Sequence, residues 1–308
     1  MFIYALVLTP PVEWLVPEFP LRQRHRLDVL GVLLLGGGAG LVLPGLSQGR
    51  DWGWWTPGTV ASFGGGVLLL GAFAGWESRV SHPDIDVRLI VRPAMRMTLL
   101  ASLSVGFLIG GYGLLMPQLL QTPDLPGIGY GAGLTATGVA LWTFPQGLLT
   151  MACGSLGGVA DRARGARPVL IAAGCLLVAA LTAAAWLPGQ RGQVLLIAGV
   201  FGAGMGPYHA AGPNLVVDAV PLRQSAVGTS MLPVANQLGA AAAATILGAV
   251  MARDIAHSDA RTGRIVYADA AFEHAFAISA VVGLAGVLVA VLMRHGRAPA
   301  GGGAASAT

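Results

Sequence analysis

The chain has 308 residues, of which 55% are hydrophobic and only 10% are charged, and its mean hydropathy is +0.70. Soluble domains carry roughly 25% charged residues, so this chain has too little polar surface to enclose a water-soluble core. The formal net charge of +4 comes from arginines that lie between apolar blocks, without aromatic–basic interleaving or a recognition helix, which argues against binding to nucleic acid.

Residues 1–19 begin with an apolar stretch that Pro10, Pro11 and Glu13 interrupt. The segment lacks the basic region and the small-residue cleavage site of a signal peptide. We expect it to be the remnant of another membrane span, shortened at its amino end.

Eight apolar blocks follow, each long enough to cross a membrane. A helix needs about 20 residues, at 1.5 Å per residue, to span roughly 30 Å of hydrocarbon. The blocks are apolar on every face, and proline, glycine or charged residues bound them. The predicted spans are 28–47, 58–76, 98–120, 131–154, 168–187, 193–217, 227–251 and 271–293. The pattern predicts an all-α integral membrane protein with about eight transmembrane helices and the shortened amino-terminal one.

The basic side chains are all arginines, and they divide unequally between the two sides of the predicted spans. Thirteen lie on one side, which includes the carboxy terminus, and five lie on the other. Because cytoplasmic loops are enriched in arginine, the first side is predicted to be cytoplasmic. The tail over residues 295–308 is rich in glycine and alanine and is expected to be disordered.

A basic segment over residues 157–167 reads GGVADRARGAR and is expected to be a tight loop between the fourth and fifth spans. Asp161, at a helix end, can pair with arginine and accept from backbone N–H groups, which would form a latch that breaks when two helices slide. An ordinary basic cytoplasmic loop is the alternative explanation. The candidate residues are Gly157, Asp161, Arg162, Gly165 and Arg167.

This segment resembles the G-x-L-A-D-R-x-G-R-R loop motif of the major facilitator superfamily, with one extra residue between Arg162 and Gly165. Further segments resemble the fourteen-span drug:proton antiporter family of that superfamily. They are WESR with HPDIDVRL at 76–89, PQLLQ at 117–121, YGAGL at 130–134 with Phe144 and Pro145, NQLG at 236–239, and Arg22 with DVLG at 28–31.

The resemblance covers nearly all of residues 20–295. It implies two central helices with a cytoplasmic linker in 20–97 and a carboxy-terminal six-helix bundle in 98–294. It also implies proton-coupled export of small hydrophobic or cationic compounds across the plasma membrane, with the amino-terminal bundle either absent or separately encoded.

His209 is the strongest candidate for a proton carrier. None of the 14 acidic residues lies in the middle of a predicted span, whereas His209 does, and imidazole titrates near neutrality. Pro207 and Pro213 would loosen this helix and free carbonyl groups to face a cavity. The alternative is a neutral histidine bonded to a neighbouring carbonyl.

Other polar and aromatic residues could line a wide, polarisable cavity suited to amphiphilic compounds. Helix packing explains each of them equally well. They are Tyr112, Gln118, Trp142, Gln146, Asn214, Thr229, Pro233, Asn236 and Gln237.

We expect no enzymatic activity, no cofactor and no metal site. Cys153 and Cys175 lie in apolar stretches without the spacing of a zinc site, and no metalloprotease, nucleophile-elbow or P-loop motif occurs. An intramembrane enzyme would need a polar pair such as His209 and Asp218, which lie about 12 Å apart along one helix.

Two function classes therefore remain. The first is a transporter, or half of one, whose partners are the lipid bilayer, a small-molecule substrate and protons. The second is a non-transporting remnant or a membrane module that binds other helices.

Overall fold

The computed structural model describes residues 29–77, 89, 91–123, 129–186, 191–221, 224–259 and 264–297. The expectations for residues 1–19, for most of the linker at 78–92 and for the tail after residue 297 lie outside these ranges.

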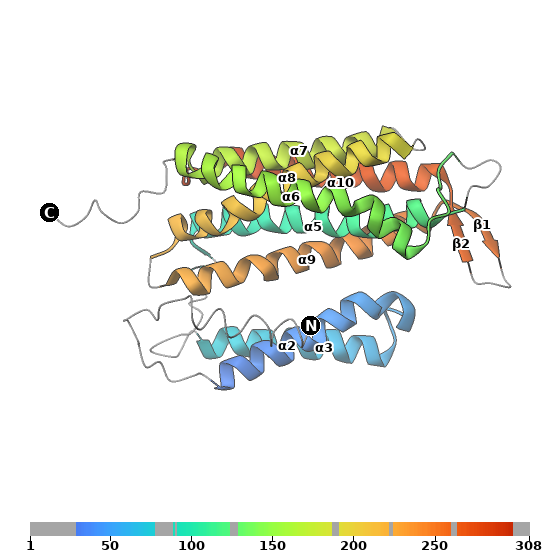
Figure 1. Ribbon diagram of the computed structural model, residues 1–308. Helices are drawn as coiled ribbons and strands as arrows, with labels where there is room; N and C mark the ends of the chain where they lie inside the picture. Colours follow the sequence, from blue (N-terminus) through green and yellow to red (C-terminus); the bar gives the residue numbers. More distant parts are fainter. Residues whose placement is uncertain are drawn as a thin grey trace, which may run out of the picture.

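Within the described residues, eight long helices account for most of the chain (Figure 1). They are α2 (Val29–Trp52), α3 (Pro57–Glu77), α5 (Pro93–Gln121), α6 (Ala136–Arg164), α7 (Ala166–Trp186), α8 (Arg191–Ala219), α9 (Ser225–Met251) and α10 (Asp269–Leu292). Six of the described helices, α3, α5, α7, α8, α9 and α10, are long and apolar enough to cross a membrane. The prediction of an all-α membrane protein is confirmed, and the number of spans stays a prediction.

The start of α6 differs from the predicted span, which begins five residues too early, at 131. Gly131 and Gly133 have φ values of 111° and 59°, a conformation that favours glycine and interrupts a helix. Thr135 then caps α6 by accepting a hydrogen bond from the backbone N–H of Gly138 at 3.2 Å.

The basic segment 157–167 is mostly helical rather than a loop, which corrects the sequence-based expectation. Helix α6 continues to Arg164, and Gly165 alone separates it from α7. Alanine and arginine are good helix formers, so the chain turns only where Gly165 adopts a φ of 88°.

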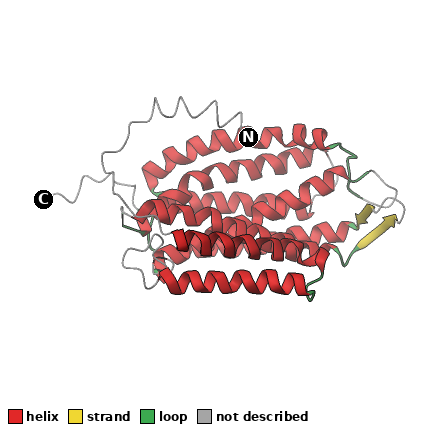
Figure 2. Ribbon diagram, turned by 90° about the horizontal axis from the view of Figure 1, so that it is seen from below, coloured by secondary structure: helices red, strands yellow, loops and turns green. Residues whose placement is uncertain are grey.

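Figures 1 and 2 show the helices running side by side, with the α2–α3 pair along one side of the bundle next to α9. In the bundle, α8 packs mainly on α6 and α7, while α5 packs mainly on α9 and α10. The core is built from fully buried apolar side chains that include Leu115, Leu177, Phe201, Leu247 and Phe276.

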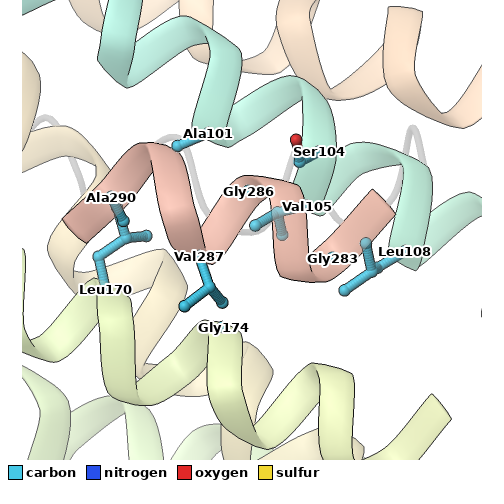
Figure 3. A pocket seen from close by; sticks show the side chains of 10 residues that line it. All are labelled: Ala101, Ser104, Val105, Leu108, Leu170, Gly174, Gly283, Gly286, Val287 and Ala290. Carbon is cyan, nitrogen blue, oxygen red and sulfur yellow. The ribbon is translucent and has the colours of Figure 1, made fainter. Parts of the chain in front are cut away.

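Small residues let α5, α7 and α10 approach closely (Figure 3). Gly174 faces Val287, and Gly283 and Gly286 face Leu108 and Ser104. The space left between these helices is about 10 Å³, the volume of a single water molecule at most. Where these three helices meet, the lining residues leave no ligand-sized cavity.

The sequence-based interpretation missed a two-stranded antiparallel sheet between α9 and α10. It consists of β1 (Ile255–Asp259) and β2 (Arg264–Tyr267). An isolated hairpin is only marginally stable. Here the Tyr130 hydroxyl donates to the Tyr267 carbonyl at 2.5 Å, and burial raises the pKa of Tyr130. This contact ties the hairpin to the segment before α6.

Candidate functional site

The contact between α6 and α8 is made by glycines that leave no room for a side chain. A Cβ atom on Gly157 would lie 2.7 Å from Pro207 Cα, and a Cβ on Gly206 would lie 2.3 Å from the Thr150 carbonyl oxygen. Gly202 is equally close to the Gln146 carbonyl. Small residues at such contacts let helix backbones approach within a membrane.

Asp161 lies in the last turn of α6 and is only 1% exposed. Its Oδ2 accepts a hydrogen bond from the side-chain amide of Asn214 on α8. Its Oδ1 is buried and has no partner among the described residues. The residue expected to form a latch with arginine therefore meets an amide in this structure, and Asn214 contacts Asp161 rather than a cavity.

Arg167 joins the start of α7 to the end of α10. Its Nε donates to the Ala290 carbonyl at 3.0 Å, its Nη2 donates to the Val291 carbonyl, and its backbone N–H donates to the Gly296 carbonyl at 2.9 Å. A cationic side chain satisfies the unpaired carbonyls at the end of a helix. Arg162, by contrast, is exposed.

His295 follows α10 and shares a hydrogen bond of 3.0 Å with the Thr98 hydroxyl of α5. Burial lowers the pKa of His295, the nearby Asp218 carboxylate opposes that shift, and Arg167 adds to it. The described chain is thus held in place through residue 296, although the tail was expected to begin at residue 295.

A cavity of about 380 Å³ lies between α8 and α9. The described residues that line it are Tyr208, His209, Gly212 and Pro213 from α8, and Thr229, Leu232, Pro233, Asn236 and Gln237 from α9. The Tyr208 hydroxyl donates to Asn236 Oδ1 at 2.8 Å and links the two walls. The cavity is within the size range of ligand pockets.

Five of the residues proposed from the sequence to line a transport pathway meet in this cavity: His209, Thr229, Pro233, Asn236 and Gln237. Its described lining contains no carboxylate, lysine or arginine. Sequence reasoning missed Tyr208, Gly212 and Leu232. Helical spacing was the available signal for two of them. Tyr208 and Gly212 lie four residues apart and therefore share a helix face, and Tyr208 adjoins His209 in the sequence.

The other candidates lie elsewhere. Tyr112 is in the core, where its ring stacks on Phe201 with centroids 3.9 Å apart, and its buried hydroxyl has no partner among the described residues. Gln118 lines a separate cavity of about 330 Å³ between the end of α5 and β2. Trp142 and Gln146 lie on α6 and line neither of these two cavities.

No family model matches the chain. Over 292 residues it is 26% identical to an uncharacterized MFS-type transporter, YcnB of Bacillus subtilis, a match that covers 90% of the chain and 57% of the relative. Over 232 residues it is 22% identical to the multidrug resistance protein Stp of Mycobacterium tuberculosis, covering 75% of the chain and 42% of the relative.

The chain is similar to transporters of the major facilitator type. It spans about half the length of the curated relatives it matches. Transporters of this type are not enzymes, so the expectation that the chain has no enzymatic activity is confirmed. The apolar helices and these relatives together identify a multi-pass membrane protein.

Proposed function

We propose that this chain forms a helical bundle of a proton-coupled exporter of the major facilitator type. Its substrates are small hydrophobic or cationic compounds, and its membrane is the plasma membrane, with the carboxy terminus in the cytoplasm. The observation that supports this most is the cavity between α8 and α9, which gathers His209, Asn236 and Gln237 on two facing helices. Polar groups inside membrane helices are costly and are functional by default.

His209 is proposed as the proton carrier. Within the described lining of the cavity, its imidazole is the group whose ordinary pKa lies near neutral pH. The side chain is exposed and lines the cavity, and in this proposal the proton reaches it through the cavity. A proton taken up there changes the charge of the cavity by one unit, which is the change that an antiporter needs to alternate between substrate and proton.

Asp161 and Asn214 are proposed as a latch at the arginine-rich end of α6 and α8. Their hydrogen bond joins the two helices next to the glycine contact, and Arg162 and Arg164 lie in the same turn as Asp161. Sliding of α8 past α6 would break the bond and leave a buried carboxylate without its donor, which is costly. Such a bond can hold one of two helix arrangements.

A second helical bundle is proposed as the partner of this one. Transporters of this type alternate access by rocking two bundles about a site near the membrane midplane. The matches cover 57% and 42% of the two relatives. In this proposal the second bundle closes the cavity from the other side.

The test is proton-driven export of ethidium in vesicles that contain the chain, alone and together with the amino-terminal bundle of a relative. His209→Ala is expected to abolish coupling to the proton gradient without changing the amount of protein, because the proton site is removed. His257→Ala, on the exposed strand β1, is the control and is expected to leave coupling unchanged.

Normal coupling in His209→Ala would count against the proton carrier. If neither preparation moves ethidium, the export proposal is wrong and a membrane module that binds other helices becomes the better explanation.

A further inference from the structure

The second cavity, of about 330 Å³, lies at the end of the bundle that carries the hairpin of β1 and β2 (Figure 1). The described residues that line it are Pro117, Gln118, Gln121, Thr122 and Pro123 at the end of α5 and just after it, and Ile265, Val266 and Tyr267 of β2. Successive side chains of a strand point to opposite faces of the sheet. A cavity that three successive residues line therefore borders the edge of the strand.

The bordering edge of β2 is the one that β1 leaves unpaired. The Ala268 N–H donates to the Asp254 carbonyl, beside β1, at 2.8 Å, and backbone groups alternate in direction along a strand. Ile265 and Tyr267 therefore turn their N–H and C=O groups away from β1, and the Tyr267 carbonyl accordingly accepts from Tyr130. Among the described residues, no hydrogen bond is made by the Tyr267 N–H or by the N–H and C=O of Ile265 on this edge.

The opposite wall of this cavity carries a buried acceptor. Gln118 Oε1 is shielded from solvent and has no hydrogen-bond partner among the described residues, which is costly for a buried polar atom. Gln121 and Ile265 are exposed, so the cavity meets the surface of the protein. No charged side chain occurs among the described lining residues. The site therefore matches a neutral ligand that offers both N–H donors and C=O acceptors.

We propose that this cavity binds a short, uncharged segment of extended peptide, which adds to the free edge of β2 as a third strand. The peptide backbone pairs with both backbone groups of Ile265 and accepts from the Tyr267 N–H. Its N–H groups on the other side face α5, where Gln118 Oε1 accepts one of them. From Ile265 to Tyr267 the edge is about 7 Å long, at about 3.4 Å per residue, so it pairs with about three peptide residues. This site goes beyond the proposed export function and does not depend on it.

The test compares two fluorescein-labelled tetrapeptide amides of the sequence Thr-Val-Thr-Val. One has an ordinary backbone, and the other is methylated at every backbone nitrogen, which keeps the side chains and removes the N–H donors. Each is titrated into the full chain in lipid nanodiscs, with empty nanodiscs as the background, and fluorescence anisotropy reports binding. The ordinary peptide is expected to bind at least about tenfold more tightly, because methylation removes two or more hydrogen bonds.

Two proline variants separate the two edges of the hairpin. Ile265→Pro removes a donor from the edge beside the cavity, and proline is tolerated where the lost N–H faces away from the paired strand. Ser258 of β1 lies directly opposite Ile265 in the register, so its N–H faces the far edge of the sheet. Ile265→Pro is expected to weaken binding of the ordinary peptide about threefold to tenfold, whereas the matched control Ser258→Pro is expected to leave it unchanged.

If the hairpin does not form in Ile265→Pro, Gln118→Met provides the comparison, because it leaves β2 intact and replaces the buried acceptor with a side chain of similar shape. It is expected to weaken binding about threefold to tenfold, and unchanged affinity overturns the inference. Equal affinity of the unmodified chain for the two peptides also overturns it, as does an equal loss in the two proline variants. Failure of the ordinary peptide to bind overturns it as well, and particles that hold two copies of the chain and exclude the peptide would assign this edge to a second copy.

Discussion

The two faces of α8 differ sharply in how they meet their neighbours. Toward α6, glycines bring the backbones together so closely that a Cβ atom on Gly206 would lie 2.3 Å from the Thr150 carbonyl. Toward α9, the same helix borders a cavity of about 380 Å³ that the bond between Tyr208 and Asn236 crosses. One helix thus has a closed glycine face and an open face that carries proline and polar residues.

Helices α5 and α9 form a second close contact through glycines. A Cβ atom on Gly239 of α9 would lie 2.0 Å from the Leu103 carbonyl of α5, and one on Gly106 of α5 would lie 2.2 Å from the Asn236 carbonyl. The bundle therefore contains two glycine-locked pairs, α6–α8 and α5–α9, and the cavity lies between the pairs. Since packed contacts resist continuous deformation, gradual motion within the bundle is expected between these pairs. A slide of α8 past α6 would instead be a discrete step that breaks the bond between Asp161 and Asn214.

The largest expected effect comes from filling the closed contact. Gly157→Ala places a methyl group 2.7 Å from Pro207 Cα, a backbone atom that cannot move aside, and overpacking of this kind costs roughly 1–3 kcal/mol. Gly158→Ala is the matched control on the same helix, because nothing lies within 4 Å of its Cβ position. Thermal unfolding in detergent measures both, and equal stability of the two variants would contradict the closed contact.

A smaller effect is expected from the bond across the cavity. Tyr208→Phe removes the hydrogen bond to Asn236 and is expected to lower stability by about 0.5–1.5 kcal/mol. Tyr112→Phe is the control, since its buried hydroxyl has no partner among the described residues and its ring keeps the stacking on Phe201. Thermal unfolding measures the stability of both variants. A greater loss of stability in Tyr112→Phe than in Tyr208→Phe would contradict the hydrogen bond across the cavity.

The smallest effect concerns His295, which connects the two glycine-locked pairs because it bonds to Thr98 of α5 and lies near Asp218 of α8. Its pKa lies below the ordinary 6.5, first because of burial, so the unfolded chain takes up this proton more readily than the folded one. Stability is therefore expected to fall as the pH drops below about 6.5.

The measurement is the melting temperature between pH 7.5 and pH 5. His295→Gln is expected to lose part of the decline that the unmodified chain shows, whereas His257→Gln, on the exposed strand β1, is expected to retain it. If the melting temperature declines equally in all three proteins, protonation of His295 does not cause the decline, and His295 does not link the two helix pairs in this way.

The apolar blocks are visible in the sequence because hydrocarbon demands long runs of apolar residues, and the long helices of the structure follow them. Helix ends are harder to predict. The segment from Gly131 to Thr135 is as apolar as a span, and only its backbone angles separate it from α6. The hairpin of β1 and β2 is short and partly polar, so its pattern resembles that of an ordinary loop.

The meeting of side chains from different helices is less predictable still. Helical spacing places His209 and Pro213 on one face, and Pro233 and Gln237 on another, but it does not say that the two faces oppose each other. The same reasoning grouped Tyr112 with the cavity, whereas the structure turns it inward onto Phe201. Which helix becomes the neighbour depends on glycine contacts between backbones, which residue type alone does not reveal.

The attachment of residues 293–296 also bears on how the protein is handled in the laboratory. Gly296 has a φ of 72°, and a Cβ atom there would lie 2.4 Å from a methyl group of Leu215, while its carbonyl accepts from Arg167. An affinity tag or fluorescent reporter fused directly after α10 would displace this segment and expose the last carbonyls of that helix. Fusion points are therefore best chosen after Arg297, beyond the last residue that the bundle holds.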